Sequence, residues 1–202
     1  MNVKIGSLLS VVAAGLLAAS AASANMLTYQ NVTFTTTALS GNELQLTIDN
    51  ATNATGDWSG VNYLYALALT SSATQWTFSS VGVSSTSIPT GTISTYLGGG
   101  LNASGCDGSG SGYFCYSWSP MLSLSNHMVF DFTFAGAPSG GEDFSLPHLK
   151  LNFYTNTNDA NKTGSLLSMD IPSGSVPEPG ALALMAVGLF GLGWAIRRRR
   201  VS

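Results

Sequence analysis

His127 and His148 are the two histidines of the chain, and so the two side chains that could serve as imidazole bases. Hydrolysis by a protein needs a nucleophile within reach of such a base, or two carboxylates held at a set distance across a cleft. Neither histidine lies in a G-x-S-x-G, H-E-x-x-H or G-x-x-x-x-G-K-[ST] motif. Each stands before a segment of alternating apolar residues, which favours the start of a strand. We therefore predict no catalytic residue, no metal site and no cofactor.

The acidic and amide side chains offer weaker candidates. Glu142 and Asp143 are neighbours, so on an extended chain their carboxylates point in opposite directions. The spacing leaves open a pair formed across the fold, for instance Asp131 with Glu43. The segment NTNDANKTG, 156–164, has oxygen-bearing side chains at the spacing of a calcium loop, but it lacks the later bidentate glutamate and its lysine opposes a cation. Turns favour Asn, Asp and Gly, so we expect a hairpin loop there.

Trp58, Trp76, Trp118 and the tyrosines allow two interpretations. Amphipathic aromatic side chains form flat stacking platforms in many sugar sites. The same side chains are large apolar groups that could equally fill a core. The sequence leaves both interpretations open.

The elements that position these groups follow an N-terminal export segment. Residues 1–24 have a basic start, an apolar stretch and small residues at the end, which is typical of a secretory signal peptide. Ala22 and Ala24 give an A-x-A site with cleavage before Asn25, and a second such site ends three residues earlier. Signal peptidase and the Sec translocon are therefore expected partners.

Residues 25–171 form the predicted ectodomain, whose length suits one domain with its own core. Two lysines oppose nine acidic residues in this range, for a formal balance of −7. Nucleic-acid binding needs a basic face that neutralises phosphates, so it is not expected.

Cys106 and Cys115 both lie in the ectodomain and bracket the Gly-rich run DGSGSGYF. Thiols of exported proteins are normally oxidised, so we predict a disulfide between them. A zinc site is not expected, because there is no neighbouring histidine or third cysteine to complete a tetrahedral ion.

Alternation of apolar and polar residues predicts strands through most of the ectodomain. It is clearest in three segments whose apolar residues would face inward: Leu44, Leu46 and Ile48; Phe130, Phe132 and Phe134; and Leu149, Leu151 and Phe153. Weaker candidates lie at 27–36, 61–69, 75–83, 112–118 and 166–171, and the stretch 84–112 is expected to form loops with one short strand near 92–97. About eight strands separated by turn residues predict an all-β fold, an antiparallel β-sandwich or jelly roll.

The chain after residue 171 consists of three segments that differ in amino-acid composition. Residues 172–180 are rich in Pro, Ser and Gly and are expected to form a linker. A helix over the uncharged residues 181–196 would span roughly 24 Å, against a hydrocarbon core of roughly 30 Å, which predicts a marginal transmembrane helix. Arginines resist translocation, so residues 197–202 predict a cytoplasmic tail and an ectodomain on the outside. These stop-transfer residues are Arg197, Arg198, Arg199 and Arg200.

The order of these features resembles the PEP-CTERM sorting domain that exosortases recognise. The resemblance covers 176 to about 200, and its motif consists of Val176, Pro177, Glu178 and Pro179. It implies that a membrane-embedded exosortase processes the chain near this motif. It also implies a Gram-negative bacterium that makes exopolysaccharide. The ectodomain resembles no enzyme family.

These features together predict an exported, non-catalytic protein of the cell surface or extracellular matrix. It would pass transiently through the inner membrane and associate with exopolysaccharide. The alternative function is a lectin-like, carbohydrate-binding sandwich, and a glycan-active enzyme is a third hypothesis.

Overall fold

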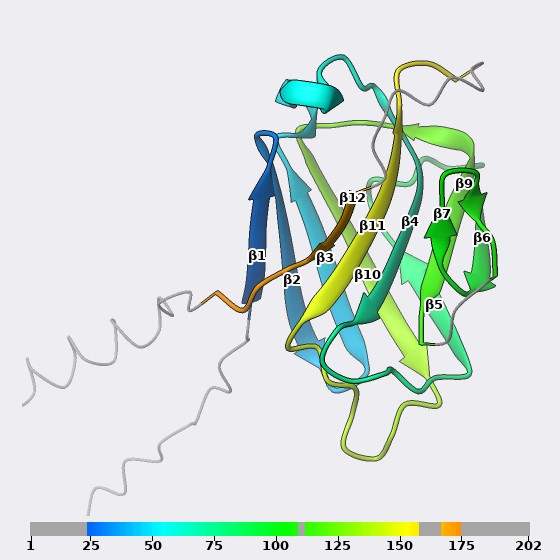
Figure 1. Cartoon of the computed structure of the whole chain (residues 1–202). Coiled ribbons are helices and arrows are strands. Elements are labelled where there is room, and N and C mark those ends of the chain that lie inside the picture. The colour runs from blue at the N-terminus through cyan, green and yellow to red at the C-terminus, as the bar shows by residue number, and fades with distance from the viewer. Residues whose placement is uncertain (1–23, 109–111, 158–166, 175–202) are drawn as a thin grey trace, which may run out of the picture.

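The computed structural model describes residues 24–108, 112–157 and 167–174 (Figure 1). Within them the chain forms β-strands and two short 3-10 helices, η1 (Ala51–Asn53) and η2 (Gly56–Trp58). The strands are β1 (Ala24–Tyr29), β2 (Val32–Ser40), β3 (Glu43–Asp49), β4 (Tyr63–Ser71), β5 (Ser80–Ser84), β6 (Ile93–Gly98), β7 (Leu101–Asn102), β8 (Gly105–Cys106), β9 (Phe114–Ser123), β10 (His127–Ala135), β11 (Pro147–Tyr154) and β12 (Leu167–Asp170). Residues 1–23 and 181–196, where the signal segment and the transmembrane helix are expected, lie outside the described ranges.

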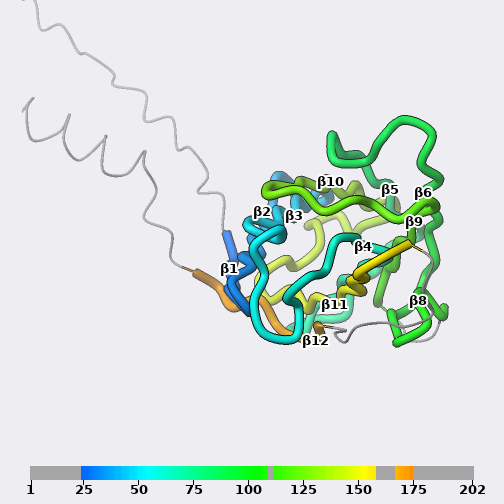
Figure 2. The backbone as a smooth tube through the Cα atoms, turned by 90° about the horizontal axis from the view of Figure 1, so that it is seen from above, coloured from blue at the N-terminus to red at the C-terminus, as the bar shows by residue number. Residues whose placement is uncertain are grey.

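Two five-stranded sheets pack face to face. Sheet A has the strand order β1-β2-β3-β10-β5, and sheet B has the order β12-β11-β4-β9-β6. Figure 2 shows the two layers from above, with β2, β3 and β10 in one and β11 and β12 in the other. The strands pair antiparallel throughout the described residues. The all-β, antiparallel prediction is therefore confirmed, with more strands than the eight expected, while the jelly-roll connectivity stays a prediction.

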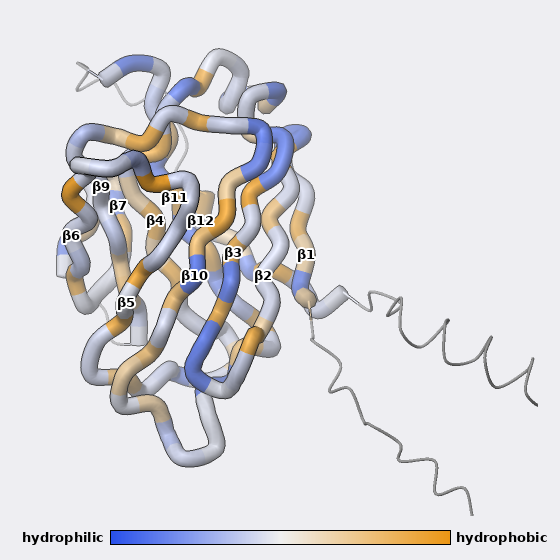
Figure 3. The backbone as a smooth tube through the Cα atoms, turned by 180° about the vertical axis from the view of Figure 1, so that it is seen from behind, coloured by the Kyte–Doolittle hydropathy of each residue, from blue (hydrophilic) through white to orange (hydrophobic). Residues whose placement is uncertain are grey.

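The alternation along the strands decides which residues enter the core. Successive side chains of a strand point to opposite faces, so every second residue meets the other sheet. Figure 3 shows this as alternating apolar and polar colours along β3 and β10. The residues that the sequence predicts to face inward are all at most 2% exposed: Leu44, Leu46, Ile48, Phe130, Phe132, Phe134, Leu149, Leu151 and Phe153.

Aromatic side chains join the two sheets across this core. The rings of Phe132 on β10 and Phe114 on β9 have centroids 4.9 Å apart. Phe130 and Trp118 make a second contact of this kind, with centroids 5.4 Å apart. Burial of one such side chain is worth roughly 1.5–3 kcal/mol, so the contacts between β9 and β10 are a main source of cohesion between the sheets.

β4 is an inner strand of sheet B and is covered on both faces. Leu67 and Leu69 face the sandwich core. Ala66 and Ala68 face outward, and Leu101 of the β7–β8 hairpin packs over them. Small side chains at these two positions let the hairpin lie close to the sheet. The strand expected at 61–69 is therefore confirmed as β4, which begins at Tyr63 and continues to Ser71.

The segment 27–36 is a hairpin, which corrects the single strand expected there. Gln30 and Asn31 have φ of 47° and 67°, and Tyr29 pairs directly with Val32. A two-residue turn with both φ values positive matches the right-handed twist of the flanking strands and favours Asn and Gly. Asn31 fits this rule, but Gln30 is not a typical turn residue, so the turn carried no clear signal in the sequence.

The segment 75–83 is mostly loop, because the strand β5 begins only at Ser80. Trp76 explains the difference. The residue is 2% exposed. Its Nε1 donates to the Asp143 carbonyl oxygen at 2.7 Å, and its ring packs edge-on against Phe134 with centroids 5.4 Å apart. The apolar residue at position 76 therefore matched the pattern of a strand, although it is buried as the anchor of a loop.

Replacement of Phe132 by alanine tests the packing of the two sheets. We expect Phe132→Ala to lower the free energy of unfolding by about 3–5 kcal/mol, because it leaves a cavity between β9 and β10. Urea denaturation followed by tryptophan fluorescence measures the loss. Thr133→Ala on the exposed face of the same strand is the control and should change stability by less than about 0.5 kcal/mol. Equal losses in both variants would contradict the packing described.

Candidate functional site

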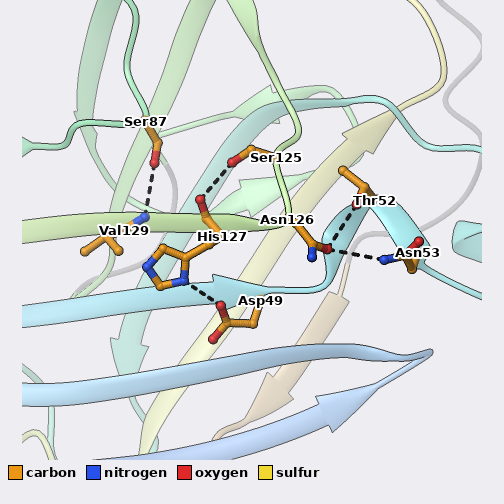
Figure 4. A network of polar contacts seen from close by, with 8 residues as sticks. All are labelled: Asp49, Thr52, Asn53, Ser87, Ser125, Asn126, His127 and Val129. Atoms are coloured by element: carbon orange, nitrogen blue, oxygen red, sulfur yellow. Dashed lines mark hydrogen bonds and ion pairs between the residues drawn. The ribbon is translucent and has the colours of Figure 1, made fainter.

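His127 begins β10 and lies on the outer face of sheet A. Asp49 stands opposite it on β3, with its Oδ1 2.6 Å from His127 Nδ1 (Figure 4). The two side chains are 66% and 43% exposed, and an exposed pair of this kind contributes little to stability. The prediction that this histidine marks a strand start is confirmed.

Amide and hydroxyl side chains hold the loops beside this pair, as Figure 4 shows. Asn126 Oδ1 accepts from Thr52 Oγ1 at 3.0 Å and from Asn53 Nδ2 at 3.3 Å. The Asn50 backbone N–H donates to the Asn126 carbonyl oxygen at 2.8 Å. These contacts join the β9–β10 turn to η1, so the polar cluster fixes loop geometry at one end of the sandwich.

His148, the second residue of β11, lies beside a serine and an aspartate of β12. Its Nδ1 is 2.7 Å from Asp170 Oδ1, and its Nε2 is 3.0 Å from Ser168 Oγ. A serine, histidine and aspartate in such a chain of contacts is the arrangement that activates a serine nucleophile. The array was not expected from the sequence, because the three residues come together only through the pairing of β11 with β12. The available signal was the S-x-D spacing, which puts Ser168 and Asp170 on one face of a strand.

The array of Ser168, His148 and Asp170 lies on an open sheet face. Ser168 and Asp170 are both exposed. A cavity of about 230 Å³ is lined by Tyr113 and residues 70–75, and none of the three residues of the array lines it. Successive N–H groups of an extended strand point to opposite sides. Neighbouring N–H groups of β12 therefore do not converge on one point, as an oxyanion hole requires.

The adjacent acids Glu142 and Asp143 have different surroundings. Burial raises the pKa of Glu142, whose Oε1 accepts from the Thr77 N–H at 2.9 Å. Hydrogen bonds from Ser145 lower the pKa of Asp143, whose Oδ1 accepts from the Ser145 N–H at 2.9 Å. Glu142 therefore joins the loop before β11 to the loop before β5, whereas Asp143 holds a turn within the loop before β11.

Two further hypotheses concern a carboxylate pair of Asp131 with Glu43 and a metal site. Asp131 Oδ1 accepts from Gln45 Nε2 at 2.8 Å, and Gln45 is its direct partner across β3 and β10, whereas Glu43 pairs with Thr133. Within the described ranges, no group of three or more His, Cys, Asp and Glu side chains could hold a metal ion. Most of the 156–164 loop, with its oxygen-rich spacing, lies outside these ranges.

The structure decides between the two interpretations of the tryptophans. Trp58, Trp76 and Trp118 are 0%, 2% and 1% exposed, so all three belong to the core. Tyr63 and Tyr65, in contrast, are only half-buried.

The predicted disulfide between Cys106 and Cys115 is present, with Cα atoms 5.6 Å apart. It attaches a flap of residues 99–108, which contains β7 and β8, to the outer face of sheet B. The flap lies so close to the sheet that a Cβ added at Gly105 would be only 2.9 Å from Tyr65 Cε1. The strand predicted near 92–97 is confirmed as β6, whereas this hairpin was not expected.

Both ends of the described chain leave the sandwich at one edge. The Met26 N–H donates to the Pro172 carbonyl oxygen at 3.1 Å, and Asn25 forms an antiparallel bridge with Ser173. Residues 171–174, orange in Figure 1, therefore run from β12 of sheet B to β1 of sheet A. Pro172 and Ser173, which the sequence assigns to the linker, pair with the first strand.

Asn25, the predicted first residue after signal cleavage, is built into this edge. It is 2% exposed, and its Nδ2 donates to the Phe144 carbonyl oxygen at 2.8 Å and to Thr36 Oγ1 at 3.4 Å. Its neighbour Ala24 is also part of β1. Paired backbone and a buried side chain do not fit the extended, accessible form that a protease binds, so the cleavage predicted before Asn25 would have to precede the pairing of β1.

The other sorting residues predicted from the sequence lie outside the described residues. These are Ala22, Val176, Pro177, Glu178, Pro179, Arg197, Arg198, Arg199 and Arg200. In the part of the chain that the structure describes, no helix has the length and apolar character needed to cross a membrane.

The fold defines the class of protein: a disulfide-bonded, antiparallel β-sandwich whose two ends leave at one edge. A family model described as the PEP-CTERM protein-sorting motif matches residues 175–200. The chain therefore carries a PEP-CTERM sorting motif, as the resemblance predicted. It is an exported protein that transits the membrane, and exosortase is its processing partner. No curated protein matches the chain.

Replacement of Asn25 by alanine tests the closed edge. We expect Asn25→Ala to lower the free energy of unfolding by about 1–3 kcal/mol, because the buried Phe144 carbonyl oxygen loses its donor. Urea denaturation measures the loss, and N-terminal sequencing checks that both proteins begin at the same residue. Thr28→Ala, exposed on the same strand, is the control and should cost less than about 0.5 kcal/mol. If Asn25→Ala costs no more than this control, Asn25 does not hold the edge.

Proposed function

We propose that this protein is a non-catalytic component of the cell surface or extracellular matrix of a Gram-negative bacterium, where its ectodomain associates with exopolysaccharide. The observation that carries the proposal is the PEP-CTERM motif at 175–200, because such a tail directs an exported chain to an exosortase. In this proposal, residues 181–196 hold the protein in the inner membrane for a time, with the arginines at 197–200 in the cytoplasm.

The position of the last paired residues supports processing beside the folded domain. Pairing with β1 extends to Ser173, and the sorting motif begins at Val176. A fully extended chain spans at most about 3.6 Å per residue, so the motif begins within roughly 11 Å of the sandwich edge. An exosortase that acts at Pro177 to Pro179 would therefore work beside β1 and residues 171–174.

The outer face of sheet A supports contact with a hydrated polymer. Its outward side chains on β2 and β3 are mainly hydroxyls and amides, namely Thr33, Thr35, Thr37, Gln45 and Thr47. Thr33 Oγ1 lies 3.0 Å from Thr28 Oγ1 on β1. Hydroxyl and amide groups both donate and accept hydrogen bonds, as polysaccharide hydroxyls do.

The geometry of the described residues also supports a non-catalytic role. The array of Ser168, His148 and Asp170 has the contacts of a nucleophile and its base. It lies on an open face and on an extended strand, without converging backbone donors for an oxyanion. A lectin-like function would place the association with polysaccharide in one defined cavity.

Replacement of the sorting motif tests the route to the matrix. We expect Pro177→Ala, Glu178→Ala and Pro179→Ala together to leave a heavier, unprocessed protein in the membrane pellet, because exosortase no longer recognises the tail. The wild-type protein should appear at its processed mass in the extracellular polysaccharide fraction. Fractionation of host cells and mass spectrometry of both proteins make the comparison.

The control for this experiment is Thr133→Ala, which changes an exposed ectodomain residue and should leave mass and location unchanged. Identical mass and location of the wild-type protein and the triple variant would contradict sorting through this motif. A processed wild-type protein that is absent from the polysaccharide fraction would contradict the association with exopolysaccharide.

Reaction with a fluorophosphonate tests the non-catalytic role. Such probes label serines whose hydroxyl is activated by a base. We expect the wild-type protein to take up no more probe than Ser168→Ala, because neighbouring N–H groups of β12 point to opposite sides of the strand and so do not form an oxyanion hole. Gel fluorescence measures labelling, with a serine protease as positive control. Strong labelling that both Ser168→Ala and His148→Ala abolish would refute the proposal.

A further inference from the structure

A cavity opens on the outer face of sheet B where β9 bulges beside β4. Ala66 pairs with Ser117 and Leu64 pairs with Leu122, so the four residues 118–121 of β9 lie opposite the single residue Tyr65. The extra length displaces β9 locally and leaves a cavity of about 390 Å³. Bulges of this kind re-aim side chains and are frequent beside binding sites.

The cavity is lined by uncharged residues of three kinds. The bulge contributes a proline and a methionine, and Tyr65 contributes an aromatic ring. Hydroxyl groups come from β6, β9 and the segment after β11, on Thr95, Ser117, Ser119 and Thr157. A volume of about 390 Å³ falls within the range of roughly 300–1,000 Å³ that is typical of small-ligand pockets.

This lining selects a class of ligand. A charged ligand would lose water without meeting an opposite charge, which is costly. A fully apolar ligand would leave the hydroxyl groups without partners. A sugar ring satisfies both demands, because its hydroxyls donate and accept hydrogen bonds while its C–H face packs on an aromatic ring. We propose that this cavity binds a neutral saccharide unit, an inference that rests on the proposed association with exopolysaccharide and locates it at Tyr65.

Tyr65 is held in place before any ligand arrives. Its ring packs edge-on against Tyr154 with centroids 5.5 Å apart. On another side the flap backbone at Gly105 lies against the ring, and the disulfide from Cys106 to Cys115 fixes the flap to β9. A preorganised side chain loses little conformational entropy on binding. The disulfide-bonded flap therefore positions the aromatic surface of the cavity.

The cavity also lies away from the edge where the chain ends leave. Within sheet B the cavity lies at β9, next to the edge strand β6, whereas β12 forms the opposite edge. Residues 171–174 continue from β12 to β1. A polysaccharide chain can therefore reach the cavity while the sorting tail still holds the opposite edge of the domain at the membrane.

Titration calorimetry of the purified mature protein tests the assignment. The probes are neutral hexasaccharides of glucose, mannose and galactose, with an alginate hexasaccharide as the charged comparison. We expect at least one neutral probe to bind and alginate to bind at least tenfold more weakly. Tyr65→Ala should weaken binding of the neutral probe at least tenfold, and Thr95→Trp, which fills the cavity from an exposed position without disturbing the core, should do the same.

Tyr113→Ala is the matched control, because Tyr113 lies on the same face of sheet B outside this cavity and its loss should change affinity less than twofold. Absence of binding to every neutral probe, tighter binding of alginate, or unchanged affinity in folded Thr95→Trp would each overturn the inference. The proposed function is judged separately by fractionation in the host. If wild-type and Thr95→Trp proteins both stay in the polysaccharide fraction, the cavity assignment fails and the association stands.

Discussion

The contact between the inner faces of the two sheets is the constraint on which the other features depend. Phe132 of β10 and Phe114 of β9 meet across the core, and the leucines of β3 and β4 fill the space beside them. A sheet with one apolar face must bury that face against another layer. Once the inner faces are joined, each strand has a defined outer face, and every polar group of interest lies on one of these faces or in a loop.

The edges of the sandwich explain why residues 171–174 pair with the first strand. A sheet edge carries unpaired N–H and C=O groups that need partners or cover. Residues 171–174 give partners to β1, because the Met26 N–H donates to Pro172 and Asn25 bridges to Ser173. The first and last described segments therefore stabilise each other. One consequence is that Asn25 and Ser173, which lie near the two ends of the described chain, are neighbours at one edge of the fold.

The two outer faces have different chemistry although the same alternation produces both. Sheet A presents rows of hydroxyl and amide side chains and the exposed pair of His127 and Asp49. Sheet B is partly covered by the flap that the disulfide attaches, and it opens at the β9 bulge beside Tyr65. The array of Ser168, His148 and Asp170 shows that triad-like contacts can arise from cross-strand pairing alone. Contacts of that kind need a pocket and oxyanion donors before they imply catalysis.

The sequence by itself determined the PEP-CTERM sorting motif, the all-β class, the inward residues such as Leu46 and Phe132, and the disulfide. These depend on local order, on composition or on a period of two residues, which the chain carries without its partners. The tertiary structure alone decided the turn at Gln30, the core position of Trp118, the side-chain contact of His148 with Ser168 and the cavity at Tyr65. Those features depend on strand register and on which face covers another, and both are set by contacts between segments far apart in the chain.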